Sequence, residues 1–100
     1  MAEAIDIASS VTTERTSLLR ACRRIAELQH HLGSVPQAIL LPIIVVASDL
    51  DNVPDEAQAA LWEPEAFRSM LRERDAYLDQ VDAELLSCFH ELKTYLQSNA

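Results

Sequence analysis

Apolar side chains in the first third of the chain recur every three or four residues, a spacing that keeps them on one face of a helix. The pattern predicts a helix over about residues 3–32, ended by Gly33 and Pro36. Its start stays open because four hydroxyl side chains could each cap a shorter helix. These are Ser9, Ser10, Thr12 and Thr13.

A second and clearer pattern runs over residues 64–97, where Pro64 suits a first helical turn and neither Gly nor Pro follows. The apolar face of this predicted helix is wide, which is more typical of a multi-helix bundle than of a two-stranded zipper. Its aromatic and long apolar members are Phe67, Met70, Tyr77, Phe89 and Tyr95.

Between the two long helices, residues 38–47 are apolar without a polar face, so this segment is expected to be surrounded by protein on every side. Pro42 removes one helical hydrogen bond and β-branched residues follow it, so a kinked helix is favoured only moderately over an extended segment. Ser34 with Gln37 suggests a capping box before this segment. A short helix is predicted over about residues 54–62.

These elements predict an all-α fold: one domain over residues 1–100, in which the two long helices surround the central apolar segment and the short helix. Helices of about 45 to 50 Å exceed the diameter of a compact sphere of this mass, so the protein is expected to be elongated, and a homodimer is expected. Glu14 and Arg74 each interrupt an apolar stripe, and we expect them to pair if the long helices run parallel.

The formal net charge of −8 lies entirely in residues 49–84, which hold eleven acids and three arginines. The charge opposes direct binding to nucleic acid. The acidic segment either only keeps the protein in solution or forms a docking face for a basic protein, even as a mimic of nucleic-acid phosphates. The residues predicted for a docking face are Asp75, Asp79, Asp82 and Glu84.

Catalytic and metal-binding patterns are weak. His30 and His31 are adjacent and Cys88 and His90 are two apart, spacings that suit no shared metal ion on a helix. With one glycine, the chain has no phosphate-binding loop and no dinucleotide fingerprint. We therefore expect no enzyme activity and no cofactor. Cys22 is expected, like Cys88, to be a reduced and buried thiol, although the sequence does not exclude a disulfide.

The sequence thus predicts a non-enzymatic binding protein: a small acidic regulator, inhibitor or adaptor for a basic protein partner. The alternative is an export or assembly chaperone that holds a client helix in an apolar groove. Trp62 either closes one end of the core or anchors the interface together with the apolar face of residues 64–97. A cytoplasmic location is expected, because the first residues lack a basic signal region and the apolar run over 38–47 is too short to span a membrane.

Overall fold

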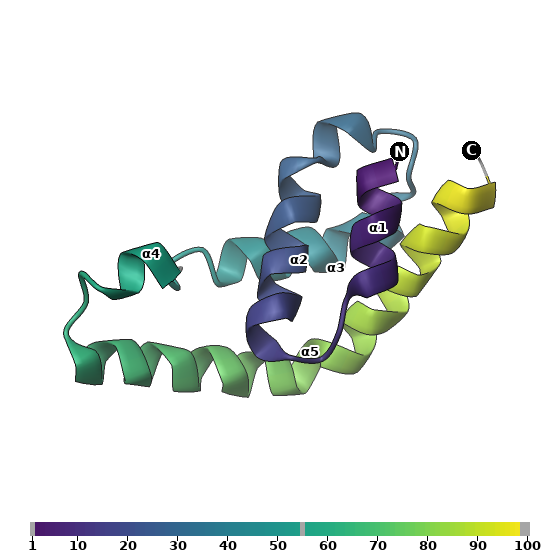
Figure 1. Cartoon of the computed structure of the whole chain (residues 1–100). Helices are drawn as coiled ribbons and strands as arrows, with labels where there is room; N and C mark the ends of the chain where they lie inside the picture. Colours follow the sequence, from purple (N-terminus) through teal and green to yellow (C-terminus); the bar gives the residue numbers. More distant parts are fainter. Residues whose placement is uncertain (1, 55, 99–100) are drawn as a thin grey trace.

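The computed structural model describes residues 2–54 and 56–98, and within these ranges the chain is helical and contains no strand. Figure 1 shows an elongated molecule, with extents of 46 × 24 × 20 Å and a radius of gyration of 14.1 Å. A compact chain of this length has a radius near 13 Å. The elements are α1 (Ala2–Ser10), α2 (Arg15–Glu27), the 3-10 helix η1 (Gln29–His31), α3 (Gln37–Asp49), α4 (Glu56–Ala59) and α5 (Pro64–Ser98).

The segment expected as one helix over residues 3–32 is divided, which corrects the expectation from the sequence. The Ser10 hydroxyl donates to the Asp6 carbonyl at 2.8 Å, within the last turn of α1. Glu14 then starts α2, since its carboxylate accepts from the backbone N–H of Thr16 at 3.1 Å and of Ser17 at 2.7 Å. The chain reverses between the two caps, so α1 descends and α2 rises in Figure 1.

The connection from α2 to α3 also differs from its expected form. Gly33 does not adopt a positive φ, and Ser34 does not cap α3. The residue before α3 is Pro36, which offers no side-chain hydrogen bond. The 3-10 turn η1, rather than a glycine cap, ends this part of the chain.

The central segment is helical with Pro42 inside it, as expected, but it is not surrounded on every side. Leu40, Ile43 and Val46 are buried where α3 packs against α2 and α5. Leu41 is 53% exposed and Val45 is 43% exposed on another side of the same helix. Two packed helices cover only part of a helix surface, which is why an entirely apolar helix here keeps an exposed face.

The long helix predicted over 64–97 is confirmed as α5, and its C-terminal half packs against α1 and α3. Its start is fixed by Glu63, whose carboxylate accepts from the backbone N–H of Glu65 at 3.1 Å and of Ala66 at 2.9 Å. The first buried residue of α5 is Leu78, so the core lies along its second half. In Figure 1 α2 crosses α5 instead of running parallel to it.

The short helix α4 covers fewer residues than the predicted 54–62, and residue 55 lies outside the described ranges. Turn hydrogen bonds from the N–H of Leu61 to Gln58 and of Trp62 to Ala59 replace its expected last turn. In the described part of the chain, no helix is long and apolar enough to cross a membrane.

Candidate protein-binding surface

The first half of α5 extends beyond the packed helices, together with α4 (Figure 1). We call residues 64–77 the α5 arm. No residue of the arm is buried, although Phe67, Met70 and Leu71 are only half-exposed and share one helix face. Just before the arm, Leu61 is 86% exposed and Trp62 is 37% exposed. Five large apolar side chains therefore lie on or beside an element that contributes nothing fully buried to the core.

Between this arm and α2 lies a cleft of about 370 Å³, which we call the α2–α5 cleft. Its volume falls in the range of ligand-binding pockets. The apolar lining is contributed by α2, by the link after α3 and by the arm: Leu19, Val53, Pro54, Phe67 and Leu71. The polar lining is Thr16, Arg20, Arg23, Arg24, Glu27 and Arg74. An apolar lining surrounded mainly by arginines is unusual in a chain of net charge −8.

Two of these arginines are held in place by the protein itself. Arg23 donates from Nη2 to the carbonyl oxygens of Leu50 at 2.9 Å and Val53 at 2.7 Å, so it fixes the link that closes one end of the cleft. Arg24 pairs with Glu27 at 2.7 Å and with Glu3 of α1, and these carboxylates raise its pKa. The described partners of Arg23 are backbone carbonyl oxygens and not carboxylates, so no negative charge in these contacts neutralises its guanidinium.

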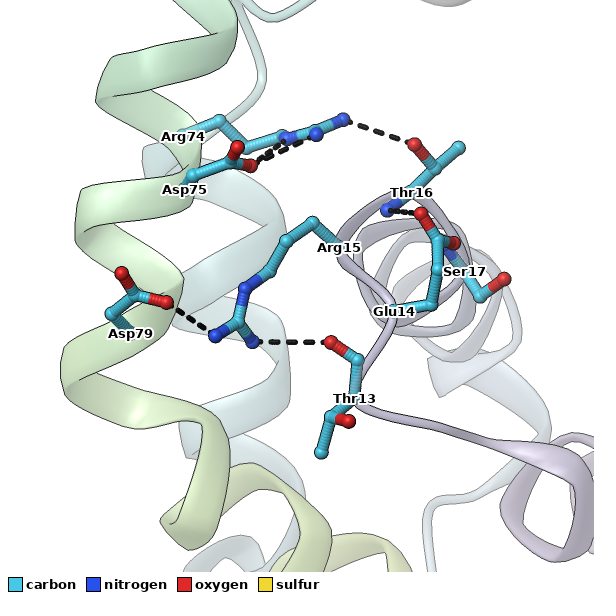
Figure 2. Close-up of polar contacts among 8 residues, drawn as sticks. All are labelled: Thr13, Glu14, Arg15, Thr16, Ser17, Arg74, Asp75 and Asp79. Atoms are coloured by element: carbon cyan, nitrogen blue, oxygen red, sulfur yellow. Dashed lines mark hydrogen bonds and ion pairs between the residues drawn. The ribbon is translucent and has the colours of Figure 1, made fainter.

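The end of the cleft nearest the start of α2 is closed by polar contacts between α2 and α5 (Figure 2). Arg74 is nearly buried, donates to the Thr16 hydroxyl at 3.2 Å and pairs with Asp75 at 2.9 Å. Arg15 binds Asp79, and its Nη2 lies 3.2 Å from Asp82. These contacts hold the start of α2 against the middle of α5, at the junction between the arm and the core.

Three of the four residues predicted as an acidic docking face are therefore engaged within the chain. Asp75 pairs with Arg74, and Asp79 and Asp82 both contact Arg15, whereas Glu84 is exposed. Each carboxylate that binds an arginine of its own chain offers less charge to a basic partner. This finding weakens the case for the acidic face as the main recognition surface.

The expected pair of Glu14 and Arg74 is also corrected. Glu14 is exposed and uses its carboxylate to cap α2, while Arg74 is paired with Asp75 and Thr16. The hydrogen bonds from the Ser17 and Thr16 amides lower the pKa of Glu14, and the positive charge of Arg74 lowers it further. Arg74 therefore acts on Glu14 only at longer range.

The six residues predicted as an interface have different surroundings. Trp62 and Phe67 lie at the arm, and Phe67 lines the cleft. Met70 packs against the edge of the core. Phe89 is fully buried, so it belongs to the core and is not available to a partner at the surface.

Two tyrosines of the predicted interface instead hold α5 to the rest of the fold. The Tyr77 hydroxyl donates to Asp49 at 2.6 Å, at the end of α3. Burial and this contact raise the pKa of Tyr77 to about 12. The Tyr95 hydroxyl donates to the Ser34 carbonyl at 2.6 Å. Both tyrosine hydroxyls thus connect α5 to other segments of the fold, which is a structural role and does not require a partner.

The structure adds candidate residues that sequence reasoning missed: Leu19, Leu71 and the arginines of α2 line the cleft, and Leu61 is exposed beside it. Leu71 lies on the apolar face of residues 64–97 at the same helical spacing as the buried residues, so its spacing alone does not show that it lines a cleft. Leu61 beside Trp62 was the available signal, since two large apolar residues next to a helix break are unusual.

Metal sites and reactive cysteines are two other kinds of site to consider among the described residues. Among the described residues, no three His, Cys, Asp or Glu side chains are grouped so that they could hold a metal ion. Cys22 and Cys88 are free and buried, and burial raises the pKa of both thiols. Burial thus keeps the thiols in the less reactive protonated form.

The α2–α5 cleft combines an apolar lining with four arginines, and it is therefore the candidate site in the described part of the chain. Comparison with protein-family models, curated proteins and solved structures finds no match to this chain.

Proposed function

We propose that the protein is a non-enzymatic binding module, a regulator or adaptor, that holds a segment of a partner protein in the α2–α5 cleft. The observation that carries this proposal is the α5 arm: residues 64–77 contain no fully buried side chain, and Phe67 and Leu71 of its apolar face line the cleft. Exposed apolar patches of this kind mark protein interaction sites more often than isolated surface leucines do. Leu61 and Trp62 extend the apolar surface past the end of the arm.

The chemistry of the cleft specifies the partner segment. A volume of about 370 Å³ accommodates a few anchor side chains and not a whole helix, so an amphipathic helix would insert one apolar face and leave the rest in solvent. Arg24 and Arg74 already pair with carboxylates of the chain, whereas the described partners of Arg23 are backbone carbonyl oxygens, so Arg23 favours an acidic side chain beside those anchors. We therefore propose an amphipathic and locally acidic segment as the ligand, in place of the basic partner expected from net charge.

The proposal is tested by affinity capture with two variants on adjacent residues of α5. Leu71→Glu places a charge in the cleft, whereas Arg72→Glu changes the charge at an exposed position of the same turn that does not line the cleft. We expect the wild type and Arg72→Glu to capture the same partner and Leu71→Glu to lose it. Far-UV circular dichroism checks that both variants are folded.

The captured partner then provides a direct binding assay. Trp62 is the only tryptophan, so a peptide without tryptophan can be titrated while the emission of Trp62 reports on the arm. We expect a peptide with leucine anchors and flanking glutamates to bind more tightly than the same peptide with lysines. Retention of the partner by Leu71→Glu, or tighter binding of the lysine peptide, would contradict the proposal.

The chaperone alternative uses the same cleft and is supported by its apolar lining and by the exposed Leu61. A chaperone would hold the client only before folding, and added salt would weaken the complex little. An adaptor that relies on Arg23 and its neighbours would bind a folded partner and lose affinity in salt. Two free, buried cysteines support a reducing location such as the cytoplasm for either role.

A further inference from the structure

A second apolar surface lies on α3, away from the cleft. It is formed by Ala38, Leu41, Pro42 and Val45, which we call the α3 ridge. Leu41 and Val45 are two of the four large apolar side chains that are exposed in the described part of the chain. The spacing places these residues along one side of the helix. The side of α3 that carries Leu40, Ile43 and Val46 is occupied by α2 and α5, so the ridge faces outward.

The ridge lies in the longest stretch of the chain without a charged side chain. From Leu28 to Ser48 there is no Asp, Glu, Lys or Arg, and the first charges on either side are Glu27 and Asp49. The rest of the chain carries the whole net charge of −8. The ridge is therefore apolar and lies in a stretch without charged side chains, whereas residues 49–84 carry the whole net charge of the chain.

The apolar character of the α3 ridge and its lack of charge indicate which kind of partner binds there. A strongly charged partner gains nothing from a neutral face, because electrostatic complementarity needs charges on both sides. Two copies of this chain repel each other wherever their acidic segments meet, and the ridge is a face where they can touch without opposing charges of the same sign. A two-fold contact also requires a surface that is complementary to itself, which an uncharged apolar ridge satisfies.

We infer that the α3 ridge pairs with the α3 ridge of a second copy of the chain, with the two helices antiparallel about a two-fold axis near Leu41. In this arrangement the two helices run in opposite directions, so the helix dipoles attract. Ala38 allows the helices to approach closely near the ends of the contact. The dimer leaves the α2–α5 cleft open, because the two surfaces share no residue.

The contact is small, and its expected strength follows from its size. A helix of 13 residues is about 20 Å long, and one helix pair buries less than the roughly 800 Å² per partner of a standard interface. We therefore expect a reversible dimer with a dissociation constant in the micromolar range. Added salt should strengthen it, because salt screens the repulsion between two acidic chains.

Sedimentation velocity of the full chain across a concentration series tests this inference with matched variants. Leu41→Lys places a charge in the centre of the ridge and makes the chain less negative, so any loss of dimer cannot come from added net repulsion. Leu61→Lys makes the same change at an exposed leucine outside the ridge. Val45→Lys gives a second ridge variant, and circular dichroism reports whether each variant is folded.

We expect the wild type and Leu61→Lys to dimerise with similar dissociation constants, and the folded ridge variants to dimerise at least about tenfold more weakly. We also expect the wild-type dimer to tighten from low to high salt. A wild type that stays monomeric throughout the series would overturn the inference. Dimers of unchanged strength in the ridge variants, equal loss in Leu61→Lys, or a dimer that salt dissociates would overturn it as well.

Discussion

At the scale of single residues, two glutamates begin the helices that form the cleft. Glu14 caps α2 and Glu63 caps α5, and each carboxylate accepts hydrogen bonds from two backbone N–H groups. Ser, Thr, Asp and Asn are the usual residues at this position, so the sequence pointed to nearby hydroxyl residues instead. A carboxylate also places negative charge at the positive end of the helix dipole. The start of α2 is thus fixed by a side chain whose role was not apparent from its residue type, whereas the start of α5 was predicted from Pro64.

Glu14→Ala should lower the melting temperature at neutral pH, because the amides of Thr16 and Ser17 lose their acceptor. The reason is the cap and not the buried ion pair expected from the sequence. Glu14→Ser is the matched control, since serine is a good cap and should retain most of the stability. Thermal unfolding followed by circular dichroism measures both variants. A melting temperature unchanged by Glu14→Ala would show that the cap is dispensable.

The same residue predicts a pH dependence. Its hydrogen bonds lower the pKa of Glu14 in the folded state below the ordinary value of 4.5. Its stabilisation is therefore fully present above that value and is lost as the pH falls through the folded-state pKa. The difference in melting temperature between wild type and Glu14→Ala should shrink as the pH is lowered below 4.5. A difference that stays constant with pH would contradict this assignment.

At the scale of elements, α3 combines a helix-breaking residue with a central position. Pro42 lies within α3 and cannot donate to the carbonyl of Ala38, and its ring crowds the preceding turn. Packing of Leu40, Ile43 and Val46 against α2 and α5 offsets that cost. Tertiary contacts therefore keep residues 37–49 helical despite the proline and the β-branched residues after it.

Pro42→Ala should stabilise the protein by about 1 to 3 kcal/mol, because it restores a helical donor and removes the ring. The measurement is urea unfolding at a protein concentration low enough to exclude any dimer. Pro36→Ala is the control, since this proline precedes the helix and its change should be within about 0.5 kcal/mol. A loss of stability in Pro42→Ala would mean that packing of the proline ring outweighs the missing hydrogen bond.

At the scale of the whole molecule, one core joins helices that are far apart in the sequence. Leu18, Cys22 and Ile25 of α2 are buried with Leu85, Cys88 and Phe89 of α5, and α1 and α3 complete the same cluster. The α5 arm contributes no fully buried residue to this core, although Met70 and Tyr77 pack against it, and the arm extends the molecule along its long axis. Such an arrangement should unfold as a unit, with the arm contributing little to the free energy of unfolding.

The two cysteines allow that cooperativity to be measured. Burial raises the pKa of Cys22 to about 12, so almost no thiolate exists at pH 8, and burial raises the pKa of Cys88 as well. We expect neither thiol to react with a disulfide reagent in the native protein and both to react in urea. The urea dependence of labelling should coincide with that of circular dichroism. Labelling of either thiol before the helical signal is lost would show that the core opens locally.

The helical class and the span of α5 could both be predicted from the amino-acid sequence. Few glycines and prolines, a long apolar periodicity and Pro64 after Glu63 are local features, and local features are what a sequence displays directly. The sequence also located the apolar centre over residues 38–47 and the acidic segment over 49–84.

The packing of the helices, in contrast, was needed to show which apolar residues are covered and which charges are already paired. Phe89 and Phe67 occupy similar positions in one stripe, yet Phe89 is in the core and Phe67 lines the cleft between α5 and α2. Asp79 and Asp82 appeared available until the fold brought Arg15 to them. Burial and charge pairing depend on distances between segments far apart in the chain, and periodicity within one segment contains no information about those distances.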